Sequence, residues 1–109
     1  MANLVILESA QRELEEIAQL HKNLVGPHSA RTITDLILDT LSHVEMFPLS
    51  GHIPRDKELR NGGYRYVIAG KYICMYRLIG EEVYVYHIAH GARNYPTLFK
   101  RLLKEDCLD

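Results

Sequence analysis

The chain has 109 residues, of which 25% are charged and 47% hydrophobic, and its formal net charge is −1 at pH 7. This length predicts one domain, residues 1–109, with a core that needs neither metal nor disulfide support. No apolar run approaches the ~20 residues of a membrane span, and the apolar run at residues 3–7 is too short for a signal-peptide core. We therefore expect a soluble, cytoplasmic protein.

The cysteines and histidines predict neither a disulfide nor a metal site. Cys74 falls in an expected strand and Cys107 in the tail, and the pair lacks the spacing of metal ligands. The six histidines form no compact ligand set either. We expect no metal and no other cofactor.

The first half of the chain predicts a strand followed by two helices. Residues 3–7 have the length and apolar character of a strand. Ser9 can cap a first helix, whose apolar positions recur every three or four residues until Gly26 and Pro27 end it. Ser29 can cap a second helix that runs to about Met46. A tight turn then makes the two helices antiparallel.

The second half predicts a loop, three strands and a last helix. Residues 47–54 are rich in helix breakers and, with the charged run 55–58, lead from helix to sheet. Alternating side chains and glycine-containing turns predict strands over Tyr64–Ala69, Tyr72–Ile79 and residues 83–89. Asn94 can cap the C-terminal helix, with Pro96 in its first turn. The order βααβββα predicts an α+β fold, with a two-helix hairpin packed on a small, twisted, mainly antiparallel sheet.

Two-residue turns at Gly70-Lys71 and Gly80-Glu81 would set the register of the three strands. Arg65 then faces Tyr76, Arg77 faces Tyr84, and Cys74 faces His87. Because side chains alternate across a strand, one sheet face would hold Arg65, Val67, Tyr72, Cys74, Tyr76, Val85 and His87. The other would hold Tyr64, Tyr66, Ile68, Ile73, Met75, Arg77, Tyr84, Tyr86, Ile88 and, if the strand extends so far, His90. The pattern leaves open which face the helices cover, and one extra residue would reverse the pairing beyond it.

Charge and aromatic residues are unevenly distributed along the chain. Residues 1–54 have a net charge of −4, residues 55–104 of +6, and the last five residues of −3. All seven tyrosines lie between Tyr64 and Tyr95, within the basic part. A basic, aromatic surface suits an anionic partner, either nucleic acid or an acidic protein segment, although a solvated sheet surface has the same composition.

Two ordered sets of motifs resemble the RelE/ParE superfamily of bacterial type II toxins, most closely its ParE branch. The first runs from Ser29-Ala30 along the second helix to Phe47-Pro48-Leu49-Ser50-Gly51, which is similar to the FPxxG-like loop of the family. The second resembles the three-stranded region and HxxR-like turn of the family, and comprises Leu59-Arg60, residues 64–67, Lys71-Tyr72, residues 75–77, residues 83–88 and His90-Gly91-Ala92-Arg93-Asn94-Tyr95.

The resemblance implies a growth-inhibiting toxin that a cognate antitoxin holds inactive, in a complex that can be a heterotetramer or larger. Family antitoxins lay an extended or helical segment with apolar anchors and acidic side chains along the toxin. ParE-like toxins poison DNA gyrase, whereas RelE-like toxins cut messenger RNA in the ribosome. A third alternative is a toxin fold that has lost toxicity and serves only as a binding module.

The candidate site residues differ between these alternatives. For RNA cleavage, His90 can act as base or acid and Arg93 can bind phosphate, as can Arg65 or Arg77. For recognition without chemistry, the expected binding residues are Arg60, Arg65, Arg77, Tyr84, Tyr86, Arg93 and Tyr95. Many family members have an arginine just after the tyrosine that opens the middle strand, but here Ile73 follows Tyr72. This difference and the near-neutral net charge favour gyrase inhibition over cleavage.

Overall fold

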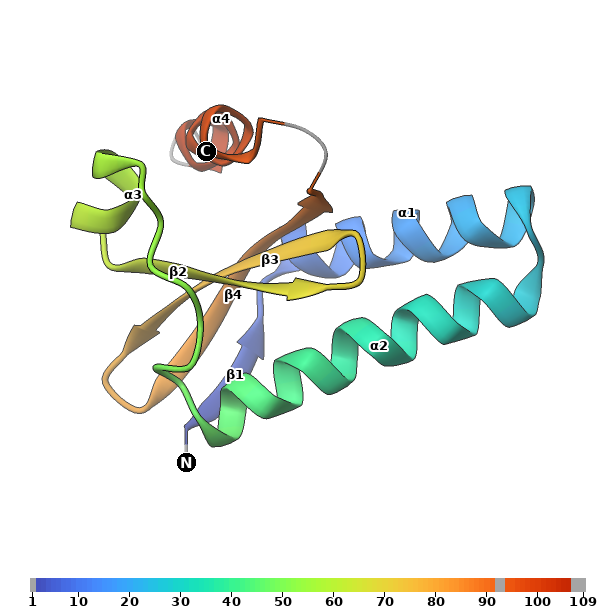
Figure 1. Cartoon of the computed structure of the whole chain (residues 1–109), viewed down its shortest axis with the longest axis horizontal. Coiled ribbons are helices and arrows are strands. Elements are labelled where there is room, and N and C mark those ends of the chain that lie inside the picture. The colour runs from blue at the N-terminus through green and yellow to red at the C-terminus, as the bar shows by residue number, and fades with distance from the viewer. Residues whose placement is uncertain (1, 92–93, 107–109) are drawn as a thin grey trace.

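The computed structural model describes residues 2–91 and 94–106 (Figure 1). The elements in chain order are β1 (Asn3–Ile6), α1 (Glu8–Leu24), α2 (Pro27–Met46), α3 (Lys57–Asn61), β2 (Tyr64–Ala69), β3 (Tyr72–Ile79), β4 (Glu82–His90) and α4 (Tyr95–Asp106). The predicted α+β class and the order of the main elements are confirmed. The prediction lacks only α3, whose first turn is capped by the Asp56 carboxylate, which accepts a hydrogen bond from the Leu59 N–H at 3.1 Å.

The two serines predicted as helix caps are inside their helices. The N-cap residues of α1 and α2 are Leu7 and Gly26, and neither makes a side-chain capping bond. Pro27 is the first residue of α2. At this position a backbone N–H would have no partner within the helix, so proline loses no hydrogen bond there. Ser9 instead donates its hydroxyl to the Tyr86 carbonyl of the sheet at 2.9 Å, so the prediction of its role was wrong.

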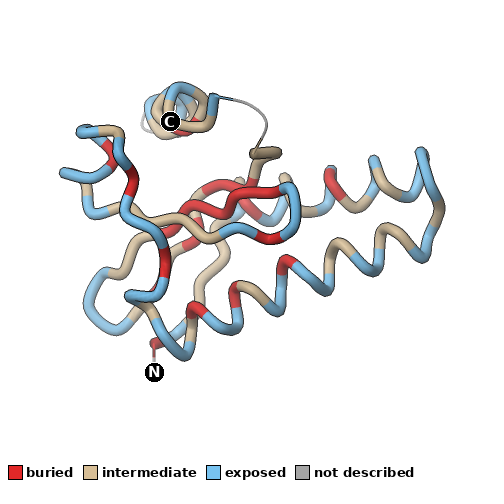
Figure 2. The backbone as a smooth tube through the Cα atoms, viewed as in Figure 1, coloured by how far each residue is buried: buried red, intermediate tan, exposed pale blue. Residues whose placement is uncertain are grey.

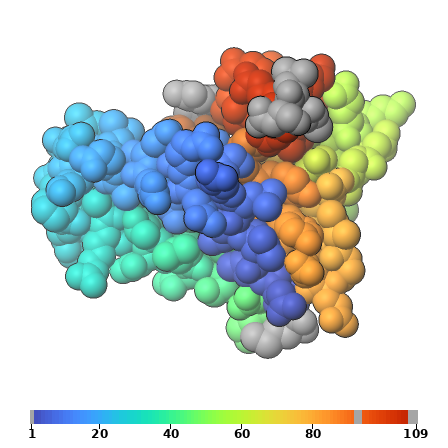
Figure 3. Space-filling model, turned by 180° about the vertical axis from the view of Figure 1, so that it is seen from behind, coloured from blue at the N-terminus to red at the C-terminus, as the bar shows by residue number. Residues whose placement is uncertain are grey.

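The sheet has four strands in the order β1-β4-β3-β2 (Figure 1). β1 pairs with β4 in parallel, and the other two pairings are antiparallel. From behind, β1 lies beside the hairpin formed by β3 and β4 (Figure 3). The first and last strands in the chain, β1 and β4, are therefore neighbours in the sheet. β1 forms one edge of the sheet and β2 forms the other.

The predicted register is confirmed up to the middle of β4 and then fails. Arg65 pairs with Tyr76 and Arg77 with Tyr84, as expected. However, a β-bulge shifts the register between Met75 and Tyr76, so that Cys74 faces Ile88 rather than His87. Because one extra residue on β4 reverses the alternation, the predicted faces of His87, Ile88 and His90 were wrong.

Helices cover both faces of the sheet. α1 and α2 pack on one face, where the largest core cluster includes Ile17, Ile37, Leu41, Tyr76 and Val85. α3 and α4 pack on the other face, where a second cluster contains Leu59, Ile73, Met75 and Phe99. Figure 2 shows the buried residues along β3 and β4 and on the side of α2 that faces the sheet. The sequence pattern did not show which face of the sheet the helices cover, because helices cover both faces.

The loop after α2 is held by a buried phenol. The Tyr76 side chain is completely buried, and its hydroxyl donates to the Pro48 carbonyl at 2.7 Å and accepts from the Gly51 N–H at 3.0 Å. A Cβ on residue 51 would lie 2.7 Å from Tyr76 Cε1, so glycine is required there for the close approach. On the same sheet face, Arg65 Nη1 donates to the carbonyls of Leu49 and Gly51 at 3.3 and 3.1 Å.

We predict that Tyr76→Phe destabilises the chain by about 1–3 kcal/mol, because it leaves the part-buried Pro48 carbonyl and the buried Gly51 N–H without their partner. Urea unfolding monitored by circular dichroism measures this loss. The matched control is Tyr84→Phe, which removes a hydroxyl that bonds the Glu82 carboxylate on a half-exposed surface. We expect the control to change stability by only about 0.5 kcal/mol or less. Equal losses in the two variants would contradict the role of Tyr76.

Candidate functional site

Arg77 lies at the centre of an aromatic cluster on the sheet face that carries α3 and α4. Its guanidinium carbon is 4.9 Å from the ring centre of Tyr64 and 5.3 Å from that of Tyr86. Nη2 and Nε donate to the Tyr86 hydroxyl at 2.8 and 3.2 Å, and Nη1 donates to the Gly62 carbonyl at 3.3 Å. The cation is therefore fixed in position and half-buried by its own chain.

Tyr84 is the neighbour of Arg77 on the adjacent strand. Its hydroxyl donates to the Glu82 Oε2 at 2.8 Å. This hydrogen bond to a carboxylate is the main cause that raises the pKa of Tyr84 above its usual value. The phenol therefore remains a neutral group near the Arg77 cluster.

Tyr95 belongs to the packing of α4 rather than to an open surface. Its ring centre is 5.2 Å from that of Tyr66 and 5.9 Å from that of Phe99, which is completely buried. Burial, assisted by the hydrogen bond with Tyr66, raises the pKa of Tyr95 to about 12. Tyr95 thus attaches the start of α4 to β2.

The remaining predicted binding residues lie apart from one another. Arg60 is exposed on α3, whereas Arg65 lies on the opposite sheet face from Arg77 and bonds the loop after α2. Arg93, predicted as both a catalytic and a binding residue, lies outside the described residues. The structure therefore brings together Arg77, Tyr84 and Tyr86, but not the whole predicted set.

His90 lies on the sheet face that α1 and α2 cover. It pairs with Tyr72, and the two rings make an edge contact with centres 5.5 Å apart. The Tyr72 hydroxyl is in turn 3.0 Å from Nε2 of His21 in α1. A hollow of about 470 Å³ opens beside these residues, between α1 and α4.

His90 does not converge with Arg77, although Arg101 of α4 lines the same hollow as His90. It pairs with the first residue of β3, whereas Arg77 is five residues further along that strand. This offset corresponds to about 17 Å at ~3.4 Å per residue. In addition, Arg77 and His90 project from opposite faces of the sheet. Phosphate held by Arg77 would be out of reach of the His90 imidazole.

A second polar cluster surrounds His87, which is 2% exposed. Its Nδ1 is 3.0 Å from a Glu13 oxygen of α1, and its Nε2 is 2.9 Å from Asp106 Oδ2 of α4. The ring also stacks on Phe99. Both ring nitrogens need a proton in order to donate to two carboxylates, so this geometry favours the imidazolium. His87 therefore connects α1 and α4 through the sheet.

No local pattern in the sequence predicts the His87 cluster. Glu13 and Asp106 are 74 and 19 residues away along the chain, and only the bulge in β4 turns His87 toward α4, which carries Asp106. Burial disfavours the charged imidazole, but the hydrogen bonds and charges of Glu13 and Asp106 outweigh it, so the pKa of His87 lies above its usual value of 6.5.

Comparison with known proteins identifies the family. A protein-family model for the ParE toxin of the type II toxin-antitoxin system parDE matches residues 4–95. The chain belongs to the ParE toxin family. This result confirms the resemblance to RelE/ParE toxins and the closer relation to ParE, and it makes the chain a toxin of a type II toxin-antitoxin system.

Solved structures share the fold of this ParE-family toxin. A chain of the chromosomal ParDE system from P. aeruginosa has a TM-score of 0.70 and 18% identity, with 83% of this chain and 96% of that chain covered. A chain of the RelBE2 toxin-antitoxin complex from Mycobacterium tuberculosis has a TM-score of 0.60 and 18% identity, with 82% and 96% covered. No curated protein sequence matches the toxin. In the part of the chain that the structure describes, no helix has the length and apolar character needed to cross a membrane.

We predict that the stabilising effect of His87 in this toxin decreases as pH rises. The folded state binds the proton more tightly than the unfolded state, so the stabilisation is complete below pH ~6.5 and is lost as pH rises through the higher folded pKa. Free energies of unfolding of the wild type and of His87→Gln, measured from pH ~5 to ~9, should therefore converge toward the alkaline end.

The matched control is the double variant Glu13→Gln, Asp106→Asn, in which the imidazole keeps neutral partners of similar shape. We expect the His87→Gln substitution made in this background to lose most of its pH-dependent effect. A difference between wild type and His87→Gln that is constant with pH would contradict a charged His87.

Proposed function

We propose that this ParE-family toxin inhibits DNA gyrase by binding it, acts in the cytoplasm, and is neutralised by a cognate antitoxin. The family match supports this target, because gyrase poisoning is the mode of action that the ParE branch implies. The higher TM-score to the ParDE chain than to the RelBE2 chain agrees with it. No chemical step by the toxin itself is needed for such an inhibitor.

The separation of His90 from Arg77 is the observation that supports binding over cleavage. Cleavage through a 2′-hydroxyl needs a base, an acid and a cation around one phosphate. Arg65 and Arg77 are instead engaged with backbone carbonyls or a phenol of their own chain, on opposite sheet faces. A rigid cluster of Arg77, Tyr84 and Tyr86 suits recognition of a protein surface, where arginine and tyrosine are the side chains that contribute most to affinity.

We predict that expression of the toxin without antitoxin stops growth and induces the DNA-damage response, while messenger RNA stays intact. His90→Ala should cause the same arrest, because His90 has no chemical role in this mechanism. Growth curves, a DNA-damage reporter and primer-extension mapping of transcripts measure the three quantities.

Two outcomes would contradict the proposal in different ways. Codon-positioned RNA cuts that disappear in His90→Ala would indicate a RelE-like endoribonuclease. An absence of growth arrest, with folded toxin present in the cells, would indicate a fold that has lost toxicity and only binds partners.

A further inference from the structure

The two halves of α4 are held to the rest of the chain by different kinds of contact. In the first half, the Phe99 ring is completely buried, and Lys100 binds Asp56 at 2.8 Å. At the end of the helix, the Asp106 carboxylate accepts a hydrogen bond from Nε2 of His87 at 2.9 Å. The Asp106 side chain is 42% exposed, so water can take the place of the imidazole there.

Glu13, the other carboxylate that bonds His87, is held more firmly than Asp106. One Glu13 oxygen is 3.0 Å from Nδ1 of His87, and the other accepts the Ile88 N–H at 3.0 Å. Ile88 is 2% exposed, so departure of Glu13 would leave a buried N–H without a partner. The Glu13 side chain is also only 21% exposed. Of the two carboxylates, Asp106 is therefore the one that can leave the imidazole at the smaller cost.

The protonation state of His87 decides whether both carboxylates can be bonded at once. The imidazolium has two N–H donors, one for each carboxylate, whereas the neutral ring has one N–H and one lone pair. That lone pair would face a carboxylate oxygen at hydrogen-bonding distance, which is repulsive. Because Glu13 is also bonded by Ile88, the neutral ring keeps its N–H on Nδ1 and turns the lone pair toward Asp106.

The elements packed around His87 contribute the following further groups. The residue opposite it on β3 is Met75, which does not titrate, and the Phe99 ring of α4 stacks on the imidazole. Glu13 also lines the hollow of about 470 Å³ between α1 and α4. The other charged or titratable residues of that hollow are Glu16, Tyr72, His90 and Arg101. Of all these groups, Glu13 is the one that bonds the ring together with Asp106.

We propose that His87 is a pH-dependent switch for the docking of the last turn of α4, residues 103–106. With the proton present, the ring joins α1 and α4 across the sheet. When the proton is lost, Asp106 turns to water and the last turn of α4 loosens, while α1 stays attached through Glu13. The hollow between α1 and α4, which Leu102 lines, then becomes more accessible. This switch is independent of the target that the toxin inhibits.

The test is amide hydrogen exchange of the full-length toxin at pH ~6 and ~9, expressed as protection factors that are corrected for the intrinsic exchange rate. Because the folded pKa of His87 lies above its usual value of 6.5, the ring is charged at the lower pH and loses its proton as pH rises. We expect the protection of residues 103–106 to fall about tenfold or more, as for the loss of one hydrogen bond to a charged group. The amides of α1 around Glu13 should change by less than about threefold.

The matched variants are Asp106→Ala and Glu105→Ala, each of which removes one carboxylate from the last turn of α4. Glu105 is exposed, and its carboxylate is 3.9 Å from the Arg101 guanidinium. A negative charge near a helix C-terminus is unfavourable, so helix electrostatics alone would give both variants more protection. The switch instead requires that Asp106→Ala lose protection at pH ~6, down to the wild-type level of pH ~9, and become insensitive to pH. Glu105→Ala should keep the pH dependence of the wild type.

Three results would overturn the switch. The first is wild-type protection of the last turn of α4 that does not change with pH, a measurement that needs no variant. The second is an equal loss of protection in Glu105→Ala and Asp106→Ala, with circular dichroism establishing that both are folded. The third is an equal loss in α1 and α4 of the wild type, which would indicate that pH lowers the stability of the whole fold. Growth arrest enters none of these measurements, so failure of the switch and failure of the proposed function are distinguishable.

Discussion

The β-bulge in β4 is the feature on which the arrangement of helices and side chains depends. Beyond the end of β1, the backbone of β4 has no neighbouring strand on that side, and α1 supplies the missing partners. Ser9 donates to the Tyr86 carbonyl at 2.9 Å, and Glu13 accepts the Ile88 N–H at 3.0 Å. Two hydrogen bonds from one face of α1 thus replace the strand ladder and fix the helix against the sheet.

The bulge also decides which side chains α4 meets. Without the extra residue, His87 would point toward α1 and α2, and Ile88 would point toward α4. With it, Tyr86 and His87 both lie on the face that α3 and α4 cover. There Tyr86 bonds Arg77, and His87 contacts Phe99 and Asp106. Ile88 returns to the larger core. A single irregularity in one strand therefore creates both polar clusters of that face.

Sequence reasoning succeeded where the determinants are local. A turn at Gly70-Lys71, where Gly70 has a φ of 60°, sets the pairing of β2 with β3, and apolar periodicity locates α1 and α2. It failed where the determinants are distant in the chain. Nothing in the local sequence of β4 marks a bulge, because the groups that stabilise it come from α1. For the same reason Ser9 resembled a helix cap, and the partners of His87 were not found.

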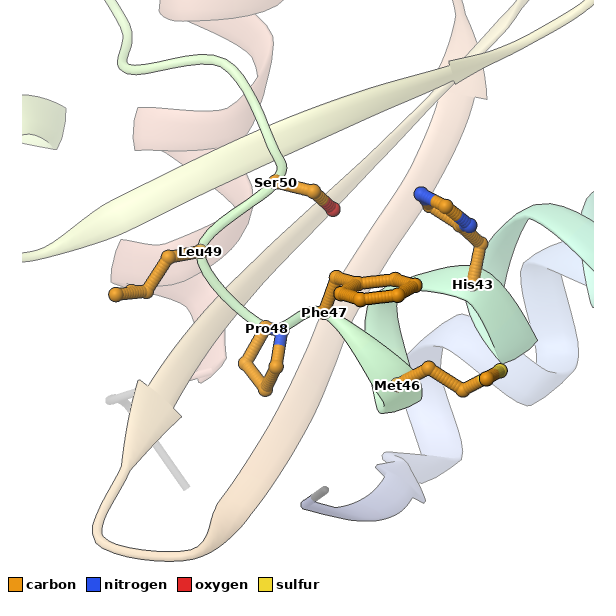
Figure 4. Close-up of a pocket in the computed structure, with 6 residues that line it drawn as sticks. All are labelled: His43, Met46, Phe47, Pro48, Leu49 and Ser50. Carbon is orange, nitrogen blue, oxygen red and sulfur yellow. The ribbon is translucent and has the colours of Figure 1, made fainter.

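The candidate site shows the same division between local and long-range information. Arg65 and Arg77 were identified from the sequence as cations on the sheet, but their hydrogen bonds to loop carbonyls and to Tyr86 depend on the tertiary fold. Each therefore contributes to the native structure, and a loss of binding on its substitution combines a stability effect with a recognition effect. Phe47 and Leu49 differ, because their side chains are exposed (Figure 4) while the backbone of their loop is bonded by Tyr76 and Arg65. In this toxin, binding measurements on variants of Arg77 therefore need a stability measurement beside them, whereas substitutions of the exposed apolar side chains leave these hydrogen bonds in place.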